Sequence, residues 1–349
     1  MEPLTFTIEP VDIRALSDAD SVVLNAFLNR QRAEDRPEDP PIPLEVHRAQ
    51  WPNIPAHDEV RMWFVRDGDE LIATAGASFE PKAEDNRHLL GVEISVAADA
   101  RQRGIGTALL RELVGLADET SRTLLMGGTS SRIPAGNAFA ERVGATKGQE
   151  QRVSQLLLDA VDPALIRTWV EEGPVRAADY ELVFVDGDIP DELMDGALAA
   201  FQVMNTAPRD DLEIEDWKLT AEHIRSWEKL RRASGGQHYT LFVRHRPSGN
   251  LVGFTEIGWN PKVPGIVQQM GTAVDPAHRG HALGKWLKAD MLRRLFEVTD
   301  FDAREVRTGN AESNDAMLGI NVALGFKPWL TSIAWQLKVD AARAYLANA

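Results

Sequence analysis

Two arginines and two glycines stand close together in the part of this chain best suited to bind an oligophosphate. Arg101 and Arg103 come just before Gly104, and Gly106 follows one residue later. Glycine leaves no side chain between a ligand and the backbone N–H groups, and a helix N-terminus adds a favourable dipole. The guanidinium groups offer charge-assisted donors to the same anion. Because many such turns need glycine only for packing, one occurrence alone decides nothing.

The residues around this stretch predict a strand, a turn and a helix. Residues 92–96 are rich in β-branched side chains, which is typical of a buried strand. From Ile105 onward, apolar residues recur at helical spacing through Leu109 and Leu113. The turn is therefore expected between a strand end and a helix N-terminus, where anions bind.

The same order of residues recurs in the second half of the chain. Arg279 and Gly284 stand 178 residues after Arg101 and Gly106, again between a predicted strand and a predicted helix. Farther on, Gly325 follows the last predicted helix, as a glycine 181 residues earlier does in the first half. Two related spacings of this length indicate a tandem duplication.

This repeated pattern resembles the GCN5-related N-acetyltransferase (GNAT) family over nearly all of both halves. In the family, a turn of the form Arg/Gln-x-x-Gly-x-Gly/Ala follows a strand and binds the pyrophosphate of acetyl-CoA. The second half departs from the pattern at Ala282, where the first glycine is expected. Residues 308–326 are similar to the C-terminal half of two-domain actinobacterial members, a group that includes mycothiol synthase.

The resemblance implies that both turns bind coenzyme A, and the turn of the first half is closer to the family pattern. His278 and His281 could donate to phosphate or lie in solvent at a helix start. Because no Asp or Glu stands at ligand spacing beside them, we do not expect a metal site there. Asn310 and Asn314 stand where family members contact the pantetheine arm, and Asn314 also suits a plain helix N-cap. The candidate cofactor-binding residues are Val96, Arg101, Gln102, Arg103, Gly104, Ile105, Gly106, Thr107, Val274, Arg279, Gly280, His281, Ala282, Leu283, Gly284, Lys285, Asn310 and Asn314.

The family's reaction implies two proton transfers. An amine attacks the acetyl thioester directly in a ternary complex, and a backbone N–H near the end of the fourth strand stabilises the oxyanion. A base must take the ammonium proton, and an acid often protonates the leaving thiolate. Many family members place a tyrosine four residues before the glycine that ends the last helix, where this chain has Ala140 and Asn321. Water, Asn321 or another residue must supply this proton, or one or both halves do not catalyse.

The general base is equally open. Family members often carry a glutamate eleven residues before the arginine of the turn, where this chain has Leu90 and Gln268. The substitutes are Glu93 in the first half and Glu256 in the second. Glu256 interrupts an apolar strand, so it must be solvated, ion-paired or functional. Glu93 can equally be an exposed strand residue.

An acidic segment in the second half is a candidate acceptor site. Residues 204–217 carry five carboxylates, with Trp217 at the end and Trp227 nearby. The position matches the region that holds acceptor substrates in the family, and this chemistry suits a cationic, partly apolar ligand. A solvated, acidic helix start explains the same residues.

Composition sets the outer bounds. A chain of 349 residues exceeds the size of one hydrophobic core, so two domains are expected. The absence of cysteine excludes disulfides, a cysteine nucleophile and thiolate metal ligands. A net charge of −15 disfavours a nucleic-acid partner and permits a cationic amine, although it also suits a merely soluble surface. Without a membrane-spanning run or a signal-peptide pattern, we expect a cytoplasmic monomer or homodimer with no membrane partner.

These observations predict an α/β (α+β) chain with two tandem GNAT folds, each a mixed, mainly antiparallel sheet flanked by helices. The expected parts are an N-terminal domain (1–160), a linker helix (161–176) and a C-terminal domain (177–349). The expected function is transfer of an acetyl group from acetyl-CoA to a primary amine of a small molecule, catalysed in the second half. The first half would be a degenerate copy that binds coenzyme without turnover. A non-catalytic coenzyme A sensor or scaffold, and acetylation of a protein or peptide, remain alternatives.

Overall fold

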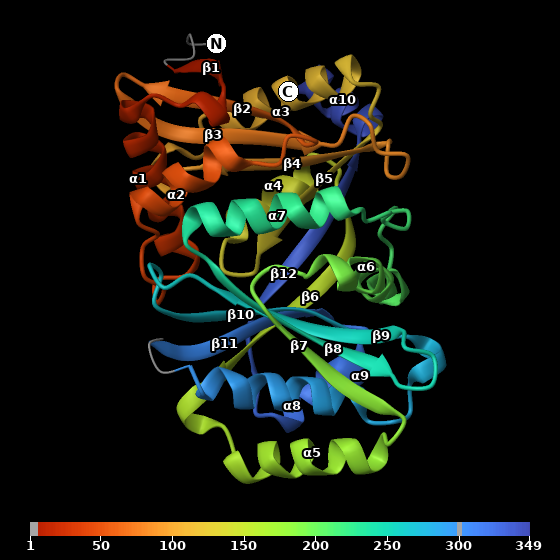
Figure 1. Cartoon of the computed structure of the whole chain (residues 1–349). Coiled ribbons are helices and arrows are strands. Elements are labelled where there is room, and N and C mark those ends of the chain that lie inside the picture. Colours follow the sequence, from red (N-terminus) through yellow and green to blue (C-terminus); the bar gives the residue numbers. More distant parts are fainter. Residues whose placement is uncertain (1–5, 299–301) are drawn as a thin grey trace. The chain divides into compact units, whose positions relative to one another are not determined.

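The structure, a computed structural model, describes residues 6–298 and 302–349 (Figure 1). The chain divides into two compact units, and each unit takes residues from both halves of the sequence. The first unit comprises Met1–Glu150, Arg209–Glu215 and Thr331–Ala349, and the second comprises Gln151–Pro208 and Asp216–Leu330.

The first unit is built on a six-stranded arrangement with helices packed against it. Its strands are β1 (Thr7–Val11), β2 (Glu59–Asp67), β3 (Glu70–Phe79), β4 (Leu89–Val96), β5 (Leu124–Ser130) and the part of β12 (Lys327–Lys338) that begins at Thr331. They lie in that order, and only β4 and β5 are parallel neighbours. The helices are α1 (Asp18–Asp35), α2 (Leu44–Gln50), α3 (Ile105–Glu119), α4 (Pro134–Arg142) and α10 (Val339–Asn348).

The second unit repeats this plan. Its strands are the part of β6 (Thr146–Leu157) that begins at Gln151, β7 (Tyr180–Asp186), β8 (Gln237–His245), β9 (Leu251–Trp259), β10 (Gly265–Val274) and β11 (Ala303–Ala311). Their order is β7-β8-β9-β10-β11-β6, with β10 and β11 parallel and the other neighbours antiparallel. The helices are α5 (Pro163–Arg176), α6 (Met194–Gln202), α7 (Ala221–Ser234), α8 (Leu283–Phe296) and α9 (Asp315–Ala323). The predicted mixed, mainly antiparallel arrangement of strands with flanking helices is thus confirmed in each unit.

The two halves of the sequence exchange their last strands. The C-terminal strand β12 pairs with β5, from Ser332↔Ser130 to Lys338↔Leu124. The strand β6, which ends the first half, pairs with β11 of the second half. The predicted boundaries at 160 and 177 therefore differ from the units of the structure. Pairing between strands so far apart along the chain leaves no local pattern in the sequence, so the exchange could not be expected there.

The predicted linker helix 161–176 corresponds to α5, and this helix belongs to the core of the second unit. Ile166 is buried in the same apolar cluster as Trp286 of α8. At Gly173 a Cβ atom would lie 2.4 Å from the Trp286 ring, so glycine is required for this close approach. The helix is therefore a packed element and not a spacer.

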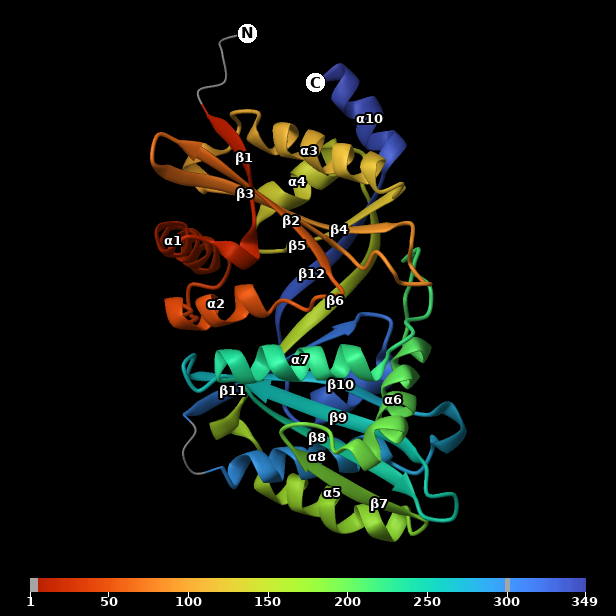
Figure 2. The same ribbon diagram turned by 45° about the horizontal axis from the view of Figure 1, so that its top comes forward.

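Helix α3 shows how the apolar pattern produces the fold. Ile105, Leu109 and Leu113 are almost completely buried against the sheet. The last helix, α10, packs against α3 (Figure 2). The Tyr345 hydroxyl lies 3.1 Å from Thr107 Oγ1. Within the described ranges, no helix combines the length and the apolar character needed to cross a bilayer.

Candidate functional site

In each unit the two parallel strands pair over only part of their length. Among the described residues, the parallel pairing ends at Gly91↔Met126 in the first unit and at Gln268↔Arg307 in the second. Beyond these pairs the facing edges offer backbone N–H and C=O groups that have no partner across the parallel ladder. An extended ligand with amide groups can hydrogen-bond to such edges.

Both predicted phosphate turns adopt the same left-handed backbone, with glycine at different places. In the first turn, Gln102 (φ 62°) and Gly104 (φ 79°) are left-handed. In the second, Gly280 (φ 91°) and Ala282 (φ 58°) are left-handed at the corresponding positions. Ala282 thus preserves the turn without the expected glycine, at a conformational cost of about 1–2 kcal/mol.

The second glycine of each turn serves helix packing. At Gly106 a Cβ atom would lie 3.2 Å from the Phe139 ring of α4, and at Gly284 it would lie 3.1 Å from Ile320 Cδ1 of α9. A side chain at either position would push these helices apart. Conversely, a Cβ atom at Gly104 would have no heavy atom within 4 Å, so that position needs glycine for its backbone conformation.

The arginines of the first turn already have carboxylate partners. Arg101 donates to both oxygens of Glu34 at 2.7 Å, and Arg103 donates to Asp67 at 2.8 Å. A bidentate pair of this kind competes with an incoming phosphate for the same donors. The first turn therefore has less uncompensated positive charge than its sequence indicates.

The second turn has a different environment. Arg279 donates to the neutral Thr206 hydroxyl at 3.0 Å and to the Val274 carbonyl. The ammonium of Lys285 lies 5.2 Å from the centre of the Trp169 ring. Within the part of the chain that the structure describes, neither cation forms an ion pair. The second turn therefore keeps more uncompensated positive charge than the first, although the first matches the sequence pattern better.

The two histidines beside Arg279 gather around one tyrosine. Tyr180 and His278 are hydrogen-bonded, with 3.0 Å between the phenol oxygen and Nδ1. The His281 ring lies 5.3 Å from the Tyr180 ring, and the His245 ring lies 5.2 Å from it. Among the residues described, no group of three or more histidines or carboxylates is arranged to hold a metal ion. These contacts give the histidines a packing role beside the turn.

A β-bulge in β10 places Glu256 at the unpaired end of the parallel strands. The register of β10 against β9 shifts between Gln269 and Thr272. Two residues of β10, Met270 and Gly271, consequently face one residue of β9, Glu256. A Cβ atom at Gly271 would lie 3.1 Å from Glu256 Oε1. Because a bulge interrupts the ladder, it frees a backbone N–H beside this carboxylate.

Two residues that the sequence analysis did not select hold this arrangement. His238 Nε2 lies 3.2 Å from Glu256 Oε2, and both side chains are mostly buried. Gln269 Nε2 donates to the Glu256 carbonyl at 2.8 Å and to Thr255 Oγ1 at 3.0 Å. His238 lies on β8, so its proximity to Glu256 depends on the β8–β9 register. That register is a tertiary property with no local signal.

Glu93 lies in a different environment. It is exposed on β4, where its recorded partner is the Ser95 hydroxyl at 3.3 Å. The pairing of β4 with β3 keeps one register from Ala73↔Val96 to Ser78↔Gly91. The first unit thus has no counterpart of the bulge in these pairs, and Glu93 is not brought together with a second acid or base.

The asparagines of the second unit divide into a cap and a buried pair. Asn314 Oδ1 accepts from the Met317 N–H at 3.3 Å, so Asn314 is the N-cap of α9. Asn321 is buried, and its Nδ2 donates to Asn310 Oδ1 at 2.7 Å. Lys288 donates to Asn321 Oδ1 at 2.7 Å. Lys288 is thus the third residue of a hydrogen-bonded network with Asn321 and Asn310, and only the structure shows that it belongs there.

The middle of the acidic candidate segment, Arg209–Glu215, belongs to the first unit. The backbone of residues 209–215 contacts Gln336, which accepts from the Glu213 N–H at 2.6 Å and donates to the Asp211 carbonyl at 2.9 Å. Glu215 and Asn86 exchange two hydrogen bonds of 2.8 Å. These contacts assign the segment a structural role that the local sequence could not reveal.

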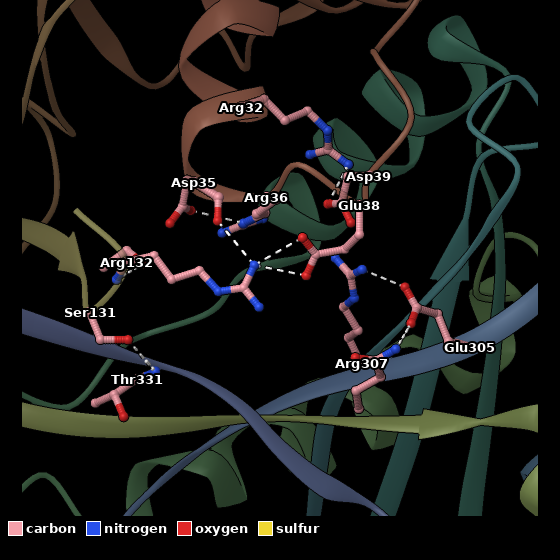
Figure 3. Close-up of polar contacts among 12 residues, drawn as sticks. Arg32, Asp35, Arg36, Glu38, Asp39, Ser131, Arg132, Glu305, Arg307 and Thr331 are labelled. Carbon is pink, nitrogen blue, oxygen red and sulfur yellow. Dashed lines mark hydrogen bonds and ion pairs between the residues drawn. The ribbon is translucent and has the colours of Figure 1, made fainter. Parts of the chain in front are cut away.

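Arg132, which follows β5, and Arg307, in the middle of β11, are also paired within their own units (Figure 3). Arg132 donates to Glu38 at 2.8 Å, which ties the irregular segment after α1 to the end of β5. Arg307 is buried with Glu305 as its ion-pair partner, and its guanidinium lies 3.7 Å from the centre of the Trp329 ring. Both guanidinium groups thus form internal ion pairs.

Comparison with known proteins identifies relatives of this architecture. The model of the "Acetyltransferase (GNAT) family" matches residues 24–144 and 202–326, more than half of the chain. A tandem GNAT protein from the clavulanic acid biosynthesis pathway, solved without AcCoA, is 25% identical, with a TM-score of 0.75 over 96% of this chain and 98% of that one. A GCN5-related N-acetyltransferase from Sphaerobacter thermophilus is 14% identical, with a TM-score of 0.64 over 97% and 96% of the two chains. A search of curated protein sequences returned no match.

Proposed function

The chain belongs to the acetyltransferase (GNAT) family, and from this premise we propose that it transfers an acetyl group from acetyl-CoA to a primary amine of a small molecule. The proposal places the chemistry in the second unit. There the phosphate turn retains its cations, and the bulge, Glu256 and His238 lie together.

The bulge opposite Glu256 is the observation that carries this proposal. In direct transfer, the amine nitrogen attacks the thioester carbon, and negative charge develops on the carbonyl oxygen. A backbone N–H released from the ladder at Met270 or Gly271 can donate to that oxygen. The N–C bond forms, the C–S bond breaks, and coenzyme A leaves as a thiolate.

Glu256 is suited to take the proton that the amine loses. Its carboxylate lies beside the bulge, so an amine that attacks a thioester held there can reach it directly or through one water. His238 contacts the second carboxylate oxygen and can hold Glu256 in this orientation or pass the proton outward. A carboxylate also attracts the ammonium form of the substrate.

The test is acetyl transfer to a panel of small primary amines, followed by release of the coenzyme thiol. Glu256→Gln keeps the side-chain shape and removes the base, so kcat/KM should fall about 100-fold or more. Glu93→Gln, the same substitution in the first unit, should leave kcat/KM within about twofold. Loss of activity in Glu93→Gln and not in Glu256→Gln would move the chemistry to the first unit.

For the first unit we propose coenzyme binding without turnover. Its turn has the required left-handed backbone, which supports binding. Its paired arginines and its regular β4 register favour a weaker, non-catalytic site.

A further inference from the structure

A lysine is buried in the second unit, where ionised groups are costly. Lys288, on α8, exposes 2% of its surface. Its ammonium donates to Asn321 Oδ1 at 2.7 Å and lies 5.5 Å from the centre of the Phe326 ring. Burying a charge with one polar partner and one ring destabilises a fold, so its presence calls for a reason.

The network has a fixed hydrogen-bond direction. Lys288 donates to Asn321 Oδ1, so the carbonyl oxygen of Asn321 faces the lysine. The Asn321 amide nitrogen then faces Asn310 and donates to its Oδ1 at 2.7 Å. Consequently, Asn310 Nδ2 points away from the network as a donor. Asn310 is half-buried on β11, three residues beyond the last residue that pairs with β10.

The first unit serves as an internal control for the role of these residues. The spacings of 178 and 181 residues that relate the two copies place Leu110 and Ala140 at the positions of Lys288 and Asn321. Both are buried in the first unit, Leu110 in its main apolar cluster and Ala140 in a smaller apolar cluster with Ile333 and Trp335. The fold therefore accepts apolar side chains at these positions, so packing alone does not require a lysine and an asparagine.

We propose that Lys288 is a positioning residue for coenzyme binding in the second unit. It orients Asn321 and, through it, Asn310, so that Asn310 Nδ2 donates to a carbonyl oxygen of the acyl-CoA arm lying along the part of β11 that does not pair with β10. The ligand chemistry is that of an extended chain with amide and thioester carbonyls. This inference rests on the proposed use of acyl-CoA, and it assigns to Lys288 a role that the local sequence pattern does not indicate.

The experiment is a calorimetric titration of acetyl-CoA into the full chain at pH 7. A Thr107→Glu background weakens the first site, because it adds negative charge at the first phosphate turn and keeps Gly106, which packs against α4. Lys285→Glu, at the corresponding residue of the second turn, identifies the second site by its loss. In the Thr107→Glu background, Lys288→Met should raise the Kd of the second site about tenfold, as expected for one well-placed hydrogen bond.

A double-mutant cycle separates positioning from general damage to the fold. Asn310→Ala should weaken binding about as much as Lys288→Met, and the combined variant should bind no more weakly than either. Thermal unfolding of Lys288→Met should not move to lower temperature, because a buried charge has been removed. The proposal would be overturned if the combined variant raised Kd by the product of the two separate increases. It would also be overturned if Lys288→Met lowered the unfolding temperature together with the affinity.

A second variant guards against poor folding of Lys288→Met. Lys288→Leu with Asn321→Ala reproduces the apolar pair of the first unit, and it should fold and still bind acetyl-CoA about tenfold more weakly. Unchanged affinity in this variant would overturn the proposal, as would a second unit that never binds acetyl-CoA. A chain that binds acetyl-CoA and acetylates no amine would refute the proposed function and leave this binding test decisive.

Discussion

At the scale of single residues, the second unit differs from the first in a few polar side chains placed in apolar surroundings. Glu256 interrupts a buried strand, and Lys288 and Asn321 replace the apolar pair of the first copy. Such groups lower stability unless each finds a partner, and here each has one. Comparison of the two copies therefore distinguishes residues that the fold requires from residues that are present in only one copy.

The pH dependence of stability follows from Lys288. Burial lowers the pKa of Lys288 from 10.5 to about 7. Between these pH values Lys288 is protonated in the unfolded chain and unprotonated in the folded chain. The free energy of unfolding therefore rises as pH increases from 7 to 10. Below about pH 7 the full cost of the buried charge remains.

We therefore expect Lys288→Met to stabilise the chain most at pH 6, and by a decreasing amount as pH approaches 10. Each unit of pKa difference corresponds to about 1.4 kcal/mol, so the change across this range should reach a few kcal/mol. Thermal unfolding of both proteins at pH 6, 8 and 10 measures it. A stability difference that stays constant with pH would mean that Lys288 keeps its ordinary pKa in the fold.

At the scale of elements, the two phosphate turns obtain one conformation from different residues. Each has two left-handed positions, and each places glycine at only one of them. By the sequence pattern, Ala282 stands where the second turn should have a glycine. In the structure, the glycine of this turn is Gly280, at the other left-handed position, two residues earlier. Absence of the expected glycine is thus no sign that the turn is lost.

This conformation predicts substitutions of opposite sign. Gly104→Ala should destabilise the first unit by about 1 kcal/mol or more, because alanine resists a φ of 79°. Gly115 lies inside helix α3, of which Gly104 is the N-cap, and a Cβ atom there would have no heavy atom within 4 Å. Gly115→Ala should therefore stabilise the first unit by about 0.5–1 kcal/mol. Chemical denaturation measures both, and equal effects would contradict the left-handed assignment of Gly104.

At the scale of the whole molecule, the exchange of last strands makes each unit depend on both halves of the sequence. The first unit is completed by β12 and α10 from the C-terminal end of the chain. Val339 and Ala342 are buried in its core, and Tyr345 contacts Thr107 beside the first phosphate turn.

Removal of residues 339–349 should therefore weaken the first unit and leave the second largely intact. Loss of the buried Val339 side chain alone should cost about 1.5–3 kcal/mol. The measurements are thermal unfolding and amide hydrogen exchange of each unit, with Tyr345→Phe as a control that removes only one hydrogen bond. Greater loss of exchange protection in the second unit than in the first would contradict this assignment.

Local patterns in the sequence determined the duplication, the element order of each half and the two phosphate turns. Each depends on neighbouring residues: apolar periodicity predicts a helix such as α3, and a glycine-rich turn before it predicts an anion site. Glu256 could be singled out because one carboxylate in an apolar strand needs an explanation.

Only the tertiary structure decided which strands complete each unit and which side chains meet at the site. The exchange of β6 and β12, the His238–Glu256 pair and the Lys288–Asn321–Asn310 network all join residues from separate elements. The charge available at each turn was also a tertiary outcome, because Glu34 and Asp67 neutralise the arginines of the first turn from distant segments. Hydrogen bonds and ion pairs depend on distance in space, and separation along the chain does not encode that distance.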